Sequence, residues 1–136
     1  MPTEKFAANF ESLENIGEFI DKAAEEAGFD ESETYAVQLA VDEACSNIIE
    51  HAYGGENQGD IKCTYKVNSN GLTIILRDKG RSFDPDSIGE PNFGAPIDQL
   101  KPRGAGLFLM RKLMDEVKFE FNPESGNVLT MVKHKD

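Results

Sequence analysis

Apolar residues recur with a helical period through the first part of the chain. Between residues 13 and 27 they fall every three to four positions, which predicts an amphipathic helix. Gly28 follows at the place where a left-handed glycine often ends a helix. Residues 3–8 precede this helix and are predicted to form a short first strand.

A second helix is predicted from about residue 31 to residue 53. Asp30 followed by Glu33 has the pattern of a capping box, in which each residue satisfies a backbone N–H of the other. The apolar positions then continue at helical spacing, and Gly54-Gly55 ends the segment.

The period changes to two in the middle of the chain. Apolar and polar residues alternate over residues 61–67, and an apolar run follows over residues 72–76. Asn70-Gly71 lies between them and suits a tight hairpin turn, because both residues tolerate positive φ. This part therefore predicts a β-hairpin whose second strand ends near Asp78.

The rest of the chain supplies one helix and two strands. Residues 79–103 are rich in Gly, Pro, Asp and Ser and show no period, so a long loop is expected there. A helix is predicted over residues 107–114, with strands over about 116–121 and 127–134. The order β-α-α-β-β-loop-α-β-β predicts an α/β (α+β) two-layer sandwich. Its mostly antiparallel, mixed sheet should be covered on one face by three helices, in a single domain over residues 1–136.

Composition narrows the classes of partner and the location. The 136 residues carry a net charge of −11, which argues against binding to nucleic acid or to an anionic membrane surface. The start of the chain does not resemble a signal peptide, and the sequence contains no apolar stretch long enough to span a membrane. A cytoplasmic location is expected. Cys45 and Cys63 lie in apolar segments and are expected to be buried free thiols.

The second predicted helix carries the first candidate site. Glu43, Asn47 and His51 are four residues apart and should share one stripe at the border of the apolar face. Burial of a carboxylate and an amide there costs free energy unless they find partners. An exposed polar face is the simpler interpretation of this spacing alone, and for His51 a packing role at the helix end is simpler than a role as catalytic base. The solvated side of the helix is expected to carry Asp42, Ser46 and Glu50.

Two glycine-containing segments are the other candidates. Asp78-Lys79-Gly80 stands at the end of a strand, where the carboxylate could accept a hydrogen bond from an exocyclic amine such as that of adenine. In isolation, an ordinary Asp/Gly turn is the favoured interpretation of this segment. Gly104-Ala105-Gly106 opens a helix, so its backbone N–H groups could bind an anion, with Arg103 adding positive charge. Neither a dinucleotide-binding fingerprint nor a P-loop is present.

The three segments together are more specific than each alone. In their order they resemble the ATPase superfamily of gyrase B, the sensor histidine kinases and the anti-sigma-factor kinases (the GHKL fold). Glu43 to Asn47 resembles its N-box, and the segments 78–80 and 104–106 resemble its two glycine boxes. The stretch 43–53, with its His-Ala-Tyr end, and the stretch 106–115 are most similar to the bacterial anti-sigma-factor serine/threonine kinases.

The resemblance implies a binding site for ATP and Mg²⁺. Asn47 is implied as the magnesium ligand and Asp78 as the reader of the adenine amine, while Gly80 and Phe83 line the base pocket. The backbone amides of residues 104–106 are implied to hold the phosphates. Glu43 is implied to orient or deprotonate the nucleophile. The remaining implied nucleotide-binding residues are Arg103, Gly104, Ala105, Gly106 and Leu107.

The resemblance also implies partners. The expected activity is transfer of phosphate from ATP to a serine of an anti-sigma-factor antagonist, by a homodimeric protein that also binds and inhibits a sigma factor. A loop over about 88–103 would then close over the nucleotide. The main alternative is a non-catalytic, nucleotide-gated module that binds a regulator. Two further alternatives are a detached ATPase or histidine-kinase catalytic domain and an acidic scaffold that binds no nucleotide.

Overall fold

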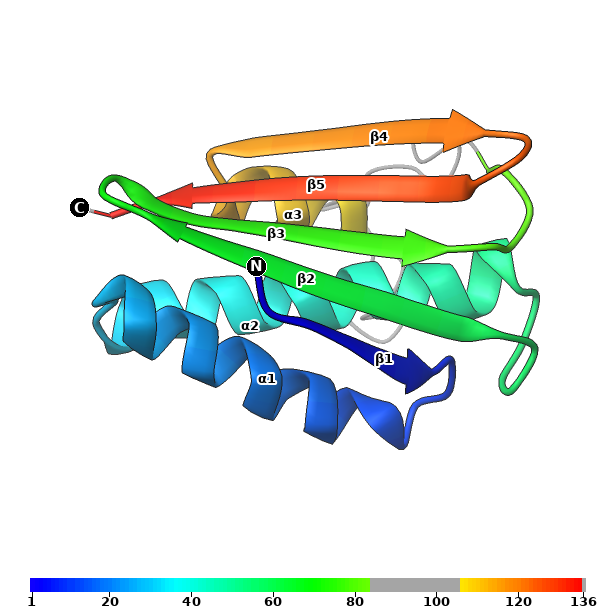
Figure 1. Cartoon of the computed structure of the whole chain (residues 1–136), viewed down its shortest axis with the longest axis horizontal. Coiled ribbons are helices and arrows are strands. Elements are labelled where there is room, and N and C mark those ends of the chain that lie inside the picture. The colour runs from blue at the N-terminus through cyan, green and yellow to red at the C-terminus, as the bar shows by residue number, and fades with distance from the viewer. Residues whose placement is uncertain (84–105, 136) are drawn as a thin grey trace, which may run out of the picture.

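The computed structural model describes residues 1–83 and 106–135 (Figure 1). A sheet forms one layer and the helices lie together on one of its faces, so the predicted two-layer fold is confirmed. No helix within these two ranges combines the length and the apolar character needed to cross a membrane. In chain order the elements are β1 (Thr3–Ala7), α1 (Ser12–Ala27), α2 (Glu31–Asn47), η1 (Ile48–Ala52), β2 (Asp60–Asn68), β3 (Gly71–Asp78), α3 (Gly106–Leu113), β4 (Glu116–Asn122) and β5 (Gly126–His134).

The five strands lie in the order β1-β2-β3-β5-β4. Every pairing between them is antiparallel, so the described sheet is more uniform than the mixed sheet that the sequence predicted. The predicted hairpin is present, with Asn68 paired to Gly71 across its turn. Because β5 inserts between β3 and β4, residues near 127 lie beside the end of β3, about fifty positions earlier in the chain.

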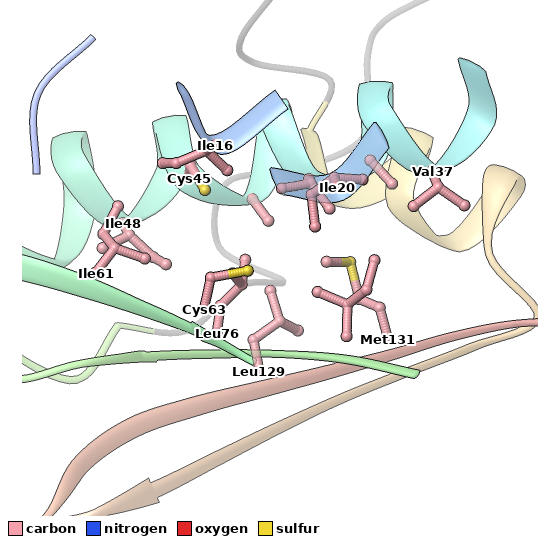
Figure 2. Packing of buried hydrophobic residues seen from close by; sticks show 14 of the residues in the cluster. Ile16, Ile20, Val37, Cys45, Ile48, Ile61, Cys63, Leu76, Leu129 and Met131 are labelled. Atoms are coloured by element: carbon pink, nitrogen blue, oxygen red, sulfur yellow. The ribbon is translucent and has the colours of Figure 1, made fainter. Parts of the chain in front are cut away.

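The core fills the space between the two layers (Figure 2). Side chains of the sheet such as Cys63, Leu76 and Leu129 point toward Ile16 and Ile20 of α1 and toward residues of α2. Alternation along each strand puts one set of residues in this core and the other on the opposite face of the sheet.

Both cysteines are buried in the core without forming a disulfide, as the sequence predicted. Burial disfavours their thiolate forms; it raises the pKa of Cys45 well above its ordinary value and that of Cys63 to about 12. Neither thiol is therefore reactive in the folded protein.

The helix α2 lies at the centre of the helical layer. It packs against α1 on one flank and α3 on the other, so little of its surface reaches solvent. For this reason the prediction that Ser46 lies on the solvated side was wrong: Ser46 is fully buried, and its hydroxyl donates to the carbonyl of Asp42 at 2.8 Å. Glu50 is exposed as predicted, and Asp42 is half-buried.

The predicted single helix from 31 to 53 consists of two parts. Its start is the predicted capping box, with Glu33 N–H donating to Asp30 at 2.7 Å and Asp30 N–H donating to Glu33 at 2.9 Å. After Asn47 the α-helix becomes a π-helical turn, η1, and the N–H of Tyr53 donates to the carbonyl of Ile48 at 3.0 Å. Insertion of a π-turn shifts the residues that follow it around the helix axis, and such turns are frequent at functional sites.

Candidate functional site

A pocket of about 220 Å³ lies between α2, α3 and the sheet. It is reached by three of the residues that the sequence singled out, namely Asn47, Asp78 and Phe83. The rest of its wall is mostly apolar, as is usual for a small-molecule site with a few polar groups that fix orientation. The remaining lining residues are Ala44, Ile48, Ser82, Met110, Phe119, Glu120, Phe121, Asn127, Val128 and Leu129.

Asn47 supplies the pocket with a buried oxygen. The residue is only 3% exposed, and its Oδ1 accepts no hydrogen bond within the part of the chain that the structure describes. A buried acceptor without a donor costs free energy in the ligand-free protein. An amide oxygen is also a ligand that Mg²⁺ accepts, usually together with phosphate oxygens and water. The donor set at Asn47 therefore fits a magnesium ion that takes its other ligands from a nucleotide.

Glu43 lies one helical turn before Asn47. Both residues belong to α2 and are buried, with Glu43 5% exposed, so the predicted stripe exists at this pair. Glu43 does not line the pocket itself, but a buried carboxylate one turn from a lining residue is suited to act as a base or to orient a hydroxyl.

Asp78 ends β3 with its carboxylate buried. The residue is 3% exposed, and its Oδ1 accepts from the N–H of Gly80 at 2.9 Å and from Nδ2 of Asn127 at 2.8 Å. Burial raises the pKa of Asp78, and these two hydrogen bonds oppose the rise. Among the residues that the structure describes, both donors bond to Oδ1, so Oδ2 can accept from a ligand amine.

Gly80 allows the turn after β3 to rest on the end of η1. A Cβ at this position would lie 2.6 Å from the carbonyl carbon of Ala52, so no other residue fits without a shift of backbone. The N–H of Arg81 donates to the carbonyl of Ala52 at 2.9 Å and its Nε to the carbonyl of His51 at 3.0 Å. The turn after β3 is thereby attached to η1, which directly follows Asn47.

His51 is not part of the pocket wall. It lies within the π-turn, and its ring packs on Phe83 with the ring centroids 5.8 Å apart. Because the π-turn separates it from the stripe of Glu43 and Asn47, the structure favours the packing role over that of a catalytic base.

Three residues around Asp78 were not predicted from the sequence to belong to the site, although Tyr53 ends the His-Ala-Tyr stretch of the resemblance. Asn127 donates to the Asp78 carboxylate and also to the carbonyl of Arg81 at 3.0 Å. Gly126 has φ +95°, and a Cβ there would collide with the carbonyl oxygen of Asp78. The hydroxyl of Tyr53 accepts from the N–H of Lys79. Asn127 and Gly126 read only as a hairpin end in the sequence, because their place beside Asp78 depends on the pairing of β3 with β5.

The second glycine segment lies mostly outside the described residues. This holds for Arg103, Gly104 and Ala105 and for the predicted nucleotide-covering loop. Gly106 is the first residue of α3 and Leu107 the second. The helix α3 packs against α2, on the side of the pocket where Met110 contributes to the wall.

Comparison with known families agrees with this geometry. The model of the histidine kinase-like ATPase domain matches residues 6–133. This chain belongs to that family. The most similar curated members of the histidine kinase-like ATPase family include the serine-protein kinases RsbW of Bacillus velezensis (37% identical over 115 residues, covering 82% of this chain and 71% of the relative) and Bacillus subtilis (35% identical, with the same coverage).

Two solved structures share the fold of this chain. The RsbU and RsbW domains of a Mycobacterium tuberculosis protein superpose with a TM-score of 0.63 at 16% identity, covering 98% of this chain and 32% of that one. The catalytic domain of the histidine kinase ThkA superposes with a TM-score of 0.56 at 17% identity, covering 99% and 98%. At these identities the structures support the architecture, while the RsbW relatives support the relation in sequence.

Proposed function

We propose that this protein is an ATP-dependent serine protein kinase and anti-sigma factor, which phosphorylates an anti-sigma-factor antagonist and sequesters a sigma factor. The observation that carries the proposal is the pocket in which Asn47 and Asp78, from the two layers of the fold, meet over an apolar wall. Its relation to the RsbW serine-protein kinases supplies the expected reaction.

The two polar residues bind opposite ends of MgATP. Asp78 accepts a hydrogen bond from the adenine amine, with Oδ1 already fixed by Gly80 and Asn127. Phe83 and the turn at Gly80 line the base. Oδ1 of Asn47 would hold Mg²⁺, which would supply positive charge against the phosphates. The backbone of residues 103–107 binds the phosphates, with Leu107 at the start of α3.

Glu43 acts on the acceptor serine. Its position on α2, one turn from Asn47, supports a role near the phosphates that Asn47 and its metal would hold. There it orients the serine hydroxyl and takes its proton as the bond from the serine oxygen to the γ-phosphorus forms, while the bond from that phosphorus to the leaving ADP breaks. A module that only bound nucleotide would have no use for a buried carboxylate at this position, so Glu43 favours the kinase over the non-catalytic alternative.

The protein partners follow from the same proposal. The phosphoacceptor is a serine of the antagonist, and phosphorylation releases the antagonist so that the kinase binds its sigma factor. We further propose that the protein acts in the cytoplasm as a homodimer, without direct contact to nucleic acid or membrane. The acidic charge of the chain fits protein partners better than nucleic acid.

Substitution Glu43→Gln tests the proposed activity. The change keeps the size and burial of the side chain but removes the base. We expect the dissociation constant for MgATP to stay within about 2-fold, while transfer of ³²P from ATP to a purified antagonist falls by roughly 100-fold or more. Nucleotide binding is measured by calorimetry and transfer by autoradiography.

Two further measurements decide between the kinase and the non-catalytic module. An antagonist with its acceptor serine changed to alanine should take up no label from the wild-type kinase. Wild-type rates of transfer by Glu43→Gln would remove Glu43 from the mechanism. Nucleotide binding without any transfer by the wild-type protein would favour the non-catalytic module instead.

A further inference from the structure

Tyr53 connects three segments that meet at one end of the molecule. It directly follows η1, and the start of β2 and the end of β3 lie at the same edge (Figure 1). Its hydroxyl donates to the carbonyl of Asp60 at 2.6 Å and accepts from the N–H of Lys79 at 2.9 Å. A phenolic hydroxyl has one proton to donate, so both of its hydrogen-bonding functions are used here.

The hydroxyl lies where the next backbone hydrogen bond between β2 and β3 would form. The strands β2 and β3 are paired up to Ile61 and Asp78, so continuation by one residue would bring Asp60 opposite Lys79. The hydroxyl lies between the carbonyl of Asp60 and the N–H of Lys79 and bonds to both. It thus keeps the backbone beside Asp78 attached to β2 while allowing the strands to separate.

Neighbouring residues are adapted to this arrangement. A Cβ at Gly59 would collide with the ring of Tyr53, so glycine makes room for the side chain. Gly80 permits the turn to lie on Ala52, one residue before Tyr53. A tyrosine hydroxyl is protonated at neutral pH in any case, and desolvation raises the pKa of Tyr53 further.

We propose that Tyr53 is a positioning residue for nucleotide recognition, which holds the adenine-reading carboxylate of Asp78 at a fixed distance from the magnesium ligand Asn47. The inference rests on the proposed function of the pocket. Asn47 and Tyr53 flank the same π-turn, and Tyr53 bonds to the residue that follows Asp78. The base side and the phosphate side of the site are therefore linked through this one hydroxyl, in addition to the backbone contact at Ala52.

Substitution Tyr53→Phe removes the hydroxyl and keeps the ring. We expect the dissociation constant for MgATP to rise about 3- to 10-fold, the effect of one lost hydrogen bond. Binding of MgGTP should change less, because its base lacks the amine that Asp78 reads. The preference for ATP over GTP should therefore shrink. Both affinities are measured by calorimetry at a temperature at which all variants are folded.

Tyr65→Phe is the matched control. Its hydroxyl also makes a hydrogen bond, to Glu26 at 2.9 Å, but the residue lies farther along β2 and outside the pocket wall. The substitution thus removes the same chemical group from a structural contact. We expect it to leave the ratio of ATP to GTP affinity unchanged, even if the melting temperature falls as much as in Tyr53→Phe.

Amide hydrogen exchange tests the connection in the absence of nucleotide. Exchange at the Lys79 and Gly80 amides should be faster in Tyr53→Phe than in the wild type and unchanged in Tyr65→Phe. Unchanged exchange, an unchanged ATP/GTP ratio in Tyr53→Phe, or an equal loss in the control would overturn the positioning role. A wild-type protein that binds no MgATP would instead overturn the proposed function, and the exchange measurement would still decide on Tyr53.

Discussion

Asp78 is the residue on which the proposed recognition of the base depends. Its carboxylate is buried, although removing a charged group from water costs free energy. Hydrogen bonds from Gly80 and Asn127 fix one of its two oxygens. The side chain is thus oriented before a ligand arrives, which lowers the entropic cost of binding.

Substitution of Asn127 should weaken binding of ATP, although no contact between Asn127 and the phosphates is proposed. In Asn127→Ala the Asp78 carboxylate loses one donor, so its orientation is less defined and its pKa rises further. We expect a roughly 10-fold weaker affinity for ATP by calorimetry. Asn122→Ala is the control, because the side chain of Asn122 accepts from the exposed hairpin N–H of Glu124 and does not line the pocket. Equal affinities of wild type and Asn127→Ala would show that Asn127 does not orient Asp78.

The buried carboxylate should also cost stability at neutral pH. Burial raises the pKa of Asp78, so between its unfolded and folded pKa values the folded protein retains a proton that the unfolded chain has lost. The free energy of unfolding therefore falls as the pH rises through the folded pKa. Asp78→Asn keeps an acceptor for Gly80 and Asn127 and cannot ionise.

We expect Asp78→Asn to melt roughly 2–6 °C above the wild type at pH 7 and to bind no ATP. The difference in melting temperature should shrink at acidic pH, where Asp78 is protonated in both states. Thermal unfolding followed by circular dichroism across this pH range measures it. A variant less stable than the wild type at pH 7 would contradict the assigned direction of the pKa shift.

The proposed role of Asn47 as a magnesium ligand predicts that its substitution lowers the affinity for ATP only when Mg²⁺ is present. Asn47→Ala removes the buried oxygen without a donor, so the free protein should lose no stability. With Mg²⁺ present we expect the affinity for ATP to fall about 10- to 100-fold, the range for contacts to charged groups. With EDTA the variant and the wild type should bind ATP equally. An equal loss in both conditions would remove Asn47 from the metal site.

Individual site residues differ in how far the sequence could predict them. Asn47 and Asp78 were predictable because helical spacing and a strand end mark them locally. Asn127 was not, since it meets Asp78 across 49 positions through a strand pairing that no local pattern encodes. Ser46 was placed wrongly because its burial depends on the helices on both flanks of α2.

At the scale of elements, the π-turn η1 and the turn after β3 form one unit. Gly80 lies against Ala52, and the N–H of Arg81 bonds to the carbonyl of the same residue. The helix α2 and the strand β3 were predicted from the spacing of their apolar residues. The π-turn between Asn47 and Tyr53 was not, because the apolar pattern there fits a continuous α-helix.

Gly80→Ala tests whether this contact is as close as the structure has it. The new Cβ would meet backbone, which cannot move aside as a flexible side chain can. We expect a loss of about 1–3 kcal/mol in the free energy of unfolding, measured with urea, together with weaker ATP binding. Gly17→Ala in α1 is the control: its Cβ has open space, so a gain of about 0.5–1 kcal/mol is expected. Similar stabilities of the two variants would contradict the close packing at Gly80.

At the scale of the whole molecule, the site lies where the two layers meet. The helical layer supplies Glu43 and Asn47, and the sheet supplies Asp78 and Asn127. A chain with a net charge of −11 repels a triphosphate. The proposed binding of ATP therefore requires a divalent cation and the glycine-rich segment near Arg103 to offset this repulsion. The fold class followed from the order of elements, whereas the pocket followed only from the strand order β3-β5-β4.

A crystal structure of the protein with Mg²⁺ and a non-hydrolysable ATP analogue tests the central claim most directly. The account predicts the adenine amine within hydrogen-bonding distance of Oδ2 of Asp78. It also predicts the metal about 2.0–2.1 Å from Oδ1 of Asn47. A nucleotide bound elsewhere, or a metal whose ligands do not include Asn47, would contradict it.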